Sequence, residues 1–250
     1  MNKPNWIRKS KLAYARTLKK LKWRLKIIRG KELIFNRQIK CKKIFLGTEY
    51  GGYFIYPENI SKDSVVYSFG IGEDISFDLD IIKHFGCEVH AFDPTPDSIN
   101  WLKKQALPEN FHYYNFGLAN SDRIAKFFPP DKEIMVSHTI LKDIYKEVPE
   151  RKAFDVELRK LKTILEFLNH NKIEILKLDI EGAEYEVIED ILTDDIEIKQ
   201  ILVEFHHRFF DDGEIKTKEI IAKLNEKGYK IFAFTAVEPN YSFIKENRQC

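Results

Sequence analysis

Acidic residues gather where one apolar stretch of the chain gives way to a helical pattern. The segment "LKLDIEGAEYEVI" places Asp179, Glu181 and Glu184 within six residues, and Gly182 permits a tight turn between them. Asp179 follows a strand pattern whose end should be buried, where a carboxylate needs partners. We therefore take Asp179 and Glu181 as candidate catalytic residues, whereas Glu184 is explained by the favourable position of an acid at a helix N-terminus.

A second group of reactive side chains follows in "VEFHHRFF". In an extended chain Glu204 and His206 lie on one side, and His207 points to the other. An acid beside a histidine is suited to proton transfer, so Glu204 and His206 join the candidate catalytic residues. His138, in the irregular segment "VSHTI", is a further candidate base.

The segment "VVYSFGIGEDISFD" ends an apolar run with Gly70 and Gly72, followed at once by Glu73 and Asp74. A P-loop would need Gly-Lys-Ser/Thr, and a dinucleotide fingerprint would need a third glycine where Ile75 stands. The two acids would repel a pyrophosphate, but they suit a ligand that carries an ammonium and a sulfonium. The alternative is that they only cap the following helix.

Two later segments extend this ligand site. In "VHAFDPTPDS", Asp93 lies about 20 residues after the glycines, where an acid accepts the hydroxyls of a ribose, and Pro94 holds the chain in a turn. In "NFGLANSD", Gly117, Leu118 and Asn120 either contact an adenine ring or form an ordinary turn. Together these features indicate S-adenosylmethionine as the cofactor.

Short apolar strands alternate with amphipathic helices from residue 65 onward, which predicts an α/β fold with a doubly wound, mostly parallel sheet. Ligands bind at the carboxyl ends of the strands of such a sheet, where all the candidate residues fall. The alternation of strands and helices becomes irregular over residues 123–171, and we expect this region to cap the active face. This region contains a Pro-marked loop "FFPPDKE", an extra strand "FDVEL" and a helix "LKTILEFLNHN".

Four segments together resemble the successive motifs of the FkbM-type methyltransferases, a branch of the class I S-adenosylmethionine-dependent enzymes. They are "YSFGIGEDISFD", "EVHAFDPTPDSI", "LKLDIEGAEYEVIEDIL" and "ILVEFHH", and "EYGGYFI" resembles a Gly-Gly-aromatic element of some members. Asp93 stands where many members have Glu. The resemblance implies a seven-stranded, Rossmann-like sheet whose last strand is antiparallel, and O-methylation of a sugar or another small hydroxyl compound.

Methyl transfer requires alignment of donor and acceptor and removal of the acceptor's proton. His206, or Asp179 with Glu204, can take that proton. A divalent cation, Mg²⁺ or Mn²⁺, held by Asp179, Glu181, Glu204 or His206 would instead lower the hydroxyl pKa. Because the carboxylates are equally explained without it, we do not expect a metal site.

Two other classes of function remain as alternatives. One is a nicotinamide-dependent oxidoreductase or sugar epimerase, which the missing third glycine and the acids after Gly72 disfavour. The other is a binding module without catalytic activity, which the acids at successive strand ends disfavour.

Composition limits the size of the domain, the cysteine chemistry and the cellular location that we expect. A chain of 250 residues with 44% hydrophobic residues can build one large core. Cys41, Cys87 and Cys250 are far apart and lack Cys-x-x-Cys spacing, so we expect neither disulfides nor a thiolate zinc site. No apolar run approaches a membrane span or a signal peptide, which indicates a cytoplasmic protein.

Charge divides the chain into a basic arm, residues 1–43, with a net charge of +15, and a domain, residues 44–250, with −13. An apolar stripe runs along a predicted helix in the arm. It comprises Tyr14, Leu18, Leu21, Leu25 and Ile28. The arm either packs on its own domain or a dimer mate, or it holds the protein at an anionic surface such as the inner membrane face. We do not expect nucleic acid as a partner, because no recognition module accompanies the arm.

Overall fold

The computed structural model describes residues 25, 33–129, 138–141, 153–235 and 240–246. A seven-stranded sheet forms the centre of the domain, in the order β11-β12-β10-β9-β3-β4-β5. Its strands are β3 (Val65–Phe69), β4 (Glu88–Phe92), β5 (Phe111–Tyr114), β9 (Lys172–Leu178), β10 (Glu197–Glu204), β11 (Tyr229–Phe234) and β12 (Asn240–Lys245). Only β12 is antiparallel to its neighbours, β10 and β11. The predicted doubly wound, mostly parallel sheet with an antiparallel last strand is confirmed.

Helices cover both faces of this sheet. On one face α4 (Leu161–Leu168), α5 (Glu184–Thr193) and α6 (Gly213–Glu226) pack in a single apolar cluster with Tyr67 and Phe69 of β3. On the other, α2 (Ser76–Phe85), α3 (Pro96–Leu102) and the hairpin of β1 (Ile44–Leu46) and β2 (Tyr53–Ile55) pack with Val66. Neighbouring residues of β3 pack against helices on opposite faces of the sheet, because side chains alternate along a strand.

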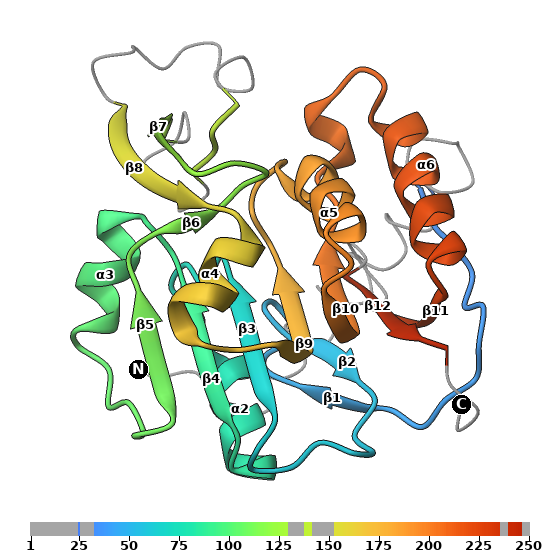
Figure 1. Cartoon of the computed structure of the whole chain (residues 1–250), viewed down its shortest axis with the longest axis horizontal. Coiled ribbons are helices and arrows are strands. Elements are labelled where there is room, and N and C mark those ends of the chain that lie inside the picture. Colours follow the sequence, from blue (N-terminus) through green and yellow to red (C-terminus); the bar gives the residue numbers. More distant parts are fainter. Residues whose placement is uncertain (1–24, 26–32, 130–137, 142–152, 236–239, 247–250) are drawn as a thin grey trace, which may run out of the picture.

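A three-stranded sheet lies beyond the carboxyl ends of β3, β4 and β5, toward which the arrows of these strands point in Figure 1. It consists of β6 (Gly117–Leu118), β8 (Phe154–Arg159) and β7 (Arg123–Phe127). The predicted extra strand corresponds to β8 and the predicted helix to α4. Only the strand belongs to the small sheet; α4 packs on a face of the large sheet, so the expectation that the whole of residues 123–171 caps the active face is wrong for this helix.

The segment from Leu33 to Lys43 leads into β1 and contacts the edge of the large sheet. Gln38 N donates to Ile231 O at 2.7 Å, and Ile231 N donates to Gln38 Oε1 at 2.8 Å. The predicted amphipathic helix of the arm lies outside the described residues, apart from Leu25, which is exposed. The two-part division at residue 43 stays a prediction.

The cysteines differ from expectation. Cys87 is a free, buried thiol, whereas Cys41 is disulfide-bonded. The expectation of no disulfide is therefore wrong; cysteine spacing could not reveal the bond, because disulfide partners are set by proximity in the fold. Within the described part of the chain, no helix has the length and apolar character needed to cross a membrane.

Candidate active site

The turn after β3 approaches the end of β9 so closely that only glycine fits. Gly70 has a φ of 73°, and a Cβ built on it would lie 1.6 Å from the carbonyl oxygen of Asp179. Lys177, which is buried, donates from Nζ to Gly70 O at 3.0 Å. The backbone of the glycine turn is thus fixed against β9, whose end is followed by the acidic cluster of Asp179, Glu181 and Glu184.

Asp93 links the ends of β3 and β4. Its Oδ2 accepts a hydrogen bond from Gly72 N at 2.9 Å, and its Oδ1 accepts bonds from Thr95 N and Thr95 Oγ1 at 2.9 and 2.7 Å. A carboxylate has about four acceptor sites, so roughly one remains, on Oδ2. Asp93 is only 5% exposed, yet it lines the large cavity described below.

The two acids after Gly72 have different environments. Asp74 accepts hydrogen bonds from Ser76 N at 2.8 Å and Thr48 Oγ1 at 2.6 Å. Burial opposes its ionisation, but the bonds from Ser76 and Thr48 hold the pKa of Asp74 below its ordinary value. Glu73 is exposed at the cavity wall. Asp74 therefore binds the backbone at the start of α2, as the capping alternative expected. The side chain of Glu73 instead remains available to a ligand in the cavity.

A cavity of about 500 Å³ opens at the carboxyl ends of β3, β4 and β9. Its volume is in the range of small-molecule sites. Phe127, His138 and Ile140 contribute to its wall from the capping region. All eight predicted cofactor residues line it, together with two of the predicted catalytic residues; these are Gly70, Gly72, Glu73, Asp74, Asp93, Pro94, Gly117, Leu118, Asp179 and Glu181. Asn120 is instead exposed and accepts a hydrogen bond from Arg123.

His206, which follows β10, contacts three acids that lie just after the end of β9. Its Nε2 lies 3.3 Å from Glu181 Oε2 and 3.9 Å from Asp179 Oδ1, and its Nδ1 lies 2.8 Å from Glu184 Oε1. Burial disfavours the imidazolium, but Glu184 and the other carboxylates raise the pKa of His206 well above its usual value. The surrounding carboxylates therefore favour the protonated form of the ring.

The turn that presents Glu181 is strained and held from two sides. Glu181 has a φ of 51°, which is uncommon for a residue with a side chain. Its carbonyl oxygen accepts a hydrogen bond from Thr139 Oγ1 at 2.7 Å. The fully buried Glu184 accepts bonds from Ile180 N and Gly182 N at 2.9 and 3.1 Å. Strain of this kind is typical of functional sites whose surroundings over-determine the backbone.

The remaining carboxylates of the cluster resist ionisation. Burial, followed by the charge of Asp179, raises the pKa of Glu204 to about 8. Burial likewise raises the pKa of Asp179, although Lys177 and His206 oppose the shift. A carboxyl group with a pKa near neutrality is suited to general base catalysis.

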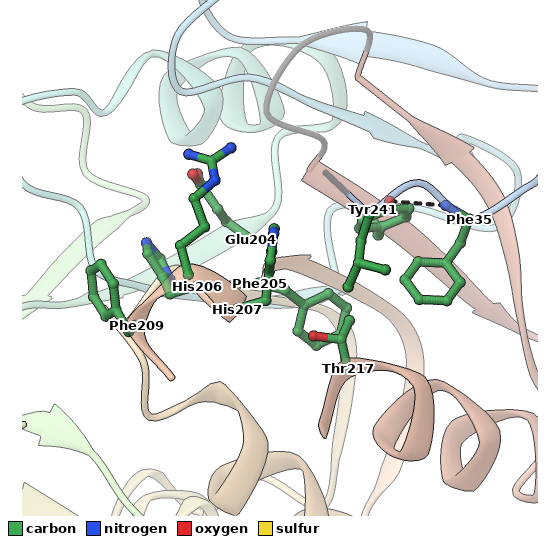
Figure 2. A pocket seen from close by; sticks show the side chains of 10 residues that line it. Phe35, Glu204, Phe205, His206, His207, Phe209, Thr217 and Tyr241 are labelled. Atoms are coloured by element: carbon green, nitrogen blue, oxygen red, sulfur yellow. Dashed lines mark hydrogen bonds between the residues drawn. The ribbon is translucent and has the colours of Figure 1, made fainter. Parts of the chain in front are cut away.

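The prediction for His207 is wrong. The chain leaves the extended conformation after Glu204, and a 3-10 helix spans His207–Phe209. His207 therefore lines the same small pocket as Glu204 and His206, rather than pointing away from them. Glu204 shares this pocket with His206, as predicted (Figure 2), but Asp179 lines the large cavity instead, so Glu204 and Asp179 do not face one common space.

Three residues of the site escaped the sequence analysis. Lys177 lies two residues before Asp179, and strand alternation could have placed both on one side. Glu184 supports His206 in addition to its own helix, a long-range role without a sequence signal. Tyr50, in the Gly-Gly-aromatic element, is exposed and lines the large cavity.

Three side chains offer ligand atoms within 4.8 Å of one another, close enough to hold a metal ion: those of Asp179, Glu181 and His206. In the described structure each nitrogen of His206 faces a carboxylate, Glu181 at Nε2 and Glu184 at Nδ1. The same side chains that could hold an ion are thus paired with one another, and the absence of a metal stays a prediction.

Comparisons with known proteins show the family of the chain. A family model described as "Methyltransferase FkbM domain" matches residues 64–231. "Probable methyltransferase-like protein 24" of Rattus norvegicus is 30% identical over 148 residues, which cover 58% of this chain and 34% of the relative. The human protein of the same name is 30% identical over 149 residues, covering 58% of this chain and 33% of the relative. The matched region is thus about a third of each relative's length.

Among solved structures, the FkbM methyltransferase from Methylobacillus flagellatus KT is similar with a TM-score of 0.46 and 12% identity, covering 75% of this chain and 45% of that one. The fold and site define a class I methyltransferase architecture. This chain belongs to the FkbM methyltransferase domain family.

Proposed function

We propose that the protein is an S-adenosylmethionine-dependent methyltransferase that acts on a hydroxyl group of a sugar, a glycan or another small metabolite. One observation carries the proposal. The cavity lined by the glycine turn and Asp93 also contains Asp179 and Glu181, so a bound cofactor and the acidic cluster share one space.

The residues around the cavity fit the cofactor. The turn at Gly70 and Gly72 brings backbone close to a ligand, and the free acceptor site on Asp93 Oδ2 suits a ribose hydroxyl. Gly117 and Leu118 offer a wall for the adenine ring, while Glu73 supplies negative charge for the cationic end. When bound, S-adenosylmethionine supplies an electrophilic methyl group on a positively charged sulfur.

The chain's own residues then have distinct tasks. Glu204 takes the proton from the acceptor hydroxyl, because its raised pKa places it near neutrality. His206, held by Glu184, lies against Asp179 and Glu181 and balances the negative charge of this group of acids. Buried carboxylates need such a partner, so His206 positions the acids instead of serving as the base.

The proposal is tested by measuring S-adenosylmethionine binding with calorimetry. Asp93→Asn should weaken binding by about tenfold or more, since hydrogen bonds to charged groups contribute about 1.5–3 kcal/mol. Asp97→Asn is the matched control, because Asp97 is an exposed acid shortly after Asp93 and should leave affinity unchanged. A wild-type protein that does not bind the cofactor would overturn the proposal, and equal affinities for the two variants would move the ribose site away from Asp93.

A further inference from the structure

The turn that joins β1 to β2 presents an exposed tyrosine at the wall of the large cavity. Tyr50 is 81% exposed, the largest exposed fraction among the large apolar side chains that the structure describes. Thr48, Tyr50 and Gly51 all line the cavity, although the family match begins only at residue 64. A segment that precedes the matched domain thus contributes to its candidate active site.

Hydrogen bonds hold this turn against the start of α2. Thr48 Oγ1 donates to Asp74 Oδ2 at 2.6 Å and accepts a bond from Gly51 N at 3.1 Å. Thr48 N donates to Ser76 Oγ at 2.8 Å. A Cβ built on Gly51 would lie only 3.0 Å from Asp74 Oδ2, so the turn and the acid approach closely. The exposed ring of Tyr50 therefore extends from a backbone whose position is fixed.

Tyr50 lies near the acids that follow β9. Asp179 and Glu181 line the same cavity as Tyr50. Desolvation, followed by the charges of Asp179 and Glu204, raises the pKa of Tyr50. Screening limits such effects of charge to about 10 Å at 0.1 M ionic strength. The phenol therefore stays protonated at neutral pH, so that it offers a ring face and a hydroxyl donor beside these acids.

Carboxyl groups dominate the charged part of the cavity wall. They belong to Glu73, Asp74, Asp93, Asp179 and Glu181. Among the described residues of the wall, Lys177 is the only lysine or arginine, and its Nζ already donates to Gly70 O. Like charges placed together strongly disfavour binding. A phosphate or carboxylate on the acceptor would therefore be repelled by this wall.

An exposed tyrosine beside several carboxyl groups favours a particular kind of acceptor. The Tyr50 ring supplies an apolar face with a polar tip, which suits the C–H surface of a compound that also carries hydroxyls. Carboxylate oxygens such as those of Glu181 are acceptors for hydroxyl donors. An uncharged compound with several hydroxyl groups meets both conditions and avoids the repulsion.

We propose that Tyr50 determines specificity by contacting the methyl acceptor in the large cavity, and that this acceptor is an uncharged polyhydroxyl compound. The inference rests on the proposed function, since it describes the acceptor of that reaction. At this place the acceptor hydroxyl shares one cavity with the cofactor site, as direct methyl transfer requires.

Two glycosides that differ in a single group test the charge of the acceptor. They are methyl β-glucopyranoside and methyl β-glucuronide, in which a carboxylate replaces the hydroxymethyl group. Each is titrated into full-length protein saturated with S-adenosylhomocysteine, and binding is followed by saturation-transfer NMR. The neutral glycoside should bind more tightly by about tenfold or more, because the carboxylate of the other meets like charge.

Substitutions of Tyr50 distinguish contact with the acceptor from a structural role. Tyr50→Ala should weaken binding of methyl β-glucopyranoside by about tenfold, through loss of the ring face, and leave the affinity for S-adenosylhomocysteine unchanged in calorimetry. Tyr50→Phe keeps the ring and should retain most of the binding. Ile215→Ala, a change at an exposed apolar residue of α6, is the matched control and should bind like the wild type.

The outcomes separate this inference from the proposed function. Preference for the neutral glycoside, with binding lost in Tyr50→Ala and kept in Tyr50→Phe and Ile215→Ala, supports the inference. Suppose instead that S-adenosylhomocysteine binds the wild type, but that neither glycoside does, that the glucuronide binds equally well, or that Tyr50→Ala binds the neutral glycoside normally or loses S-adenosylhomocysteine as well. Each of these results overturns the inference while the proposed function stands. If S-adenosylhomocysteine does not bind the wild type, the proposed function fails first.

Discussion

Glu184 and His206 lie 22 residues apart in the chain, yet Glu184 Oε1 and His206 Nδ1 are 2.8 Å apart in the folded protein. The same carboxylate accepts hydrogen bonds from Ile180 N and Gly182 N, so it fixes the histidine and the acidic turn together. One buried carboxylate thereby sets the geometry of both strand ends.

Replacing Glu184 should change the ionisation of its partner. Glu184→Gln keeps an oxygen for the backbone donors but removes the negative charge, so the pKa of His206 should fall, as an NMR titration of the imidazole would show. Turnover should decrease by about tenfold to a hundredfold, because misplaced groups can cost that much. Glu189→Gln, at an exposed position of α5, is the control. An unchanged His206 pKa in Glu184→Gln would contradict the assignment.

Activity should rise with pH as Glu204 ionises. With a pKa of about 8, Glu204 is mostly protonated at pH 7, so kcat should increase through pH 8 and then level off. Glu204→Gln should remove this rise and lower kcat by about a hundredfold or more. A rise through pH 8 that persists in Glu204→Gln would assign the base to another group.

The same pKa shifts predict how stability depends on pH. Glu204 has a higher pKa folded than unfolded, so the free energy of unfolding should fall as pH rises from about 4.5 toward about 8. The contribution of His206 has the same sign, since it is complete below pH 6.5 and is lost as pH rises through the raised pKa of the folded state. Urea titrations at several pH values measure this decline, and Glu204→Gln should make it shallower.

Two glycines with similar backbone angles should respond differently to alanine. Gly70 and Gly86 have φ values of 73° and 67°, but a Cβ on Gly86 meets nothing within 4 Å, whereas one on Gly70 overlaps Asp179 O. Gly86→Ala should cost roughly 1–2 kcal/mol from backbone strain alone. Gly70→Ala should lower Tm further and abolish cofactor binding in calorimetry. Equal effects of the two substitutions would show that the close approach to Asp179 is unimportant.

Dialysis against EDTA should leave turnover unchanged. The reason is that His206, which belongs to the group of three potential ligands, is already engaged by Glu181 and Glu184. The measurement is the initial rate before and after dialysis, followed by addition of Mg²⁺ or Mn²⁺. Loss of activity that either ion restores would replace the proposed ion-paired mechanism with a metal-assisted one.

Local sequence patterns determined the sheet and the residues that line the large cavity at its edge. Alternating strands and helices predicted the doubly wound architecture, and all eight residues predicted for the cofactor line one cavity. This succeeded because parallel strands bring their carboxyl ends to one edge, so that residues such as Gly70 and Asp93 become neighbours once the strand order is known.

Only the tertiary structure decided how the acids, His206 and the small pocket are combined. The chain turns into a 3-10 helix after Glu204, which brings His207 into the pocket against the expectation from strand alternation. Phe35 reaches Tyr241 across 206 residues, and Glu184 reaches His206 from another element. Contacts of this kind depend on packing between elements distant in sequence, and the periodicity that reveals a strand or helix carries no information about which side chain fills a neighbour's pocket.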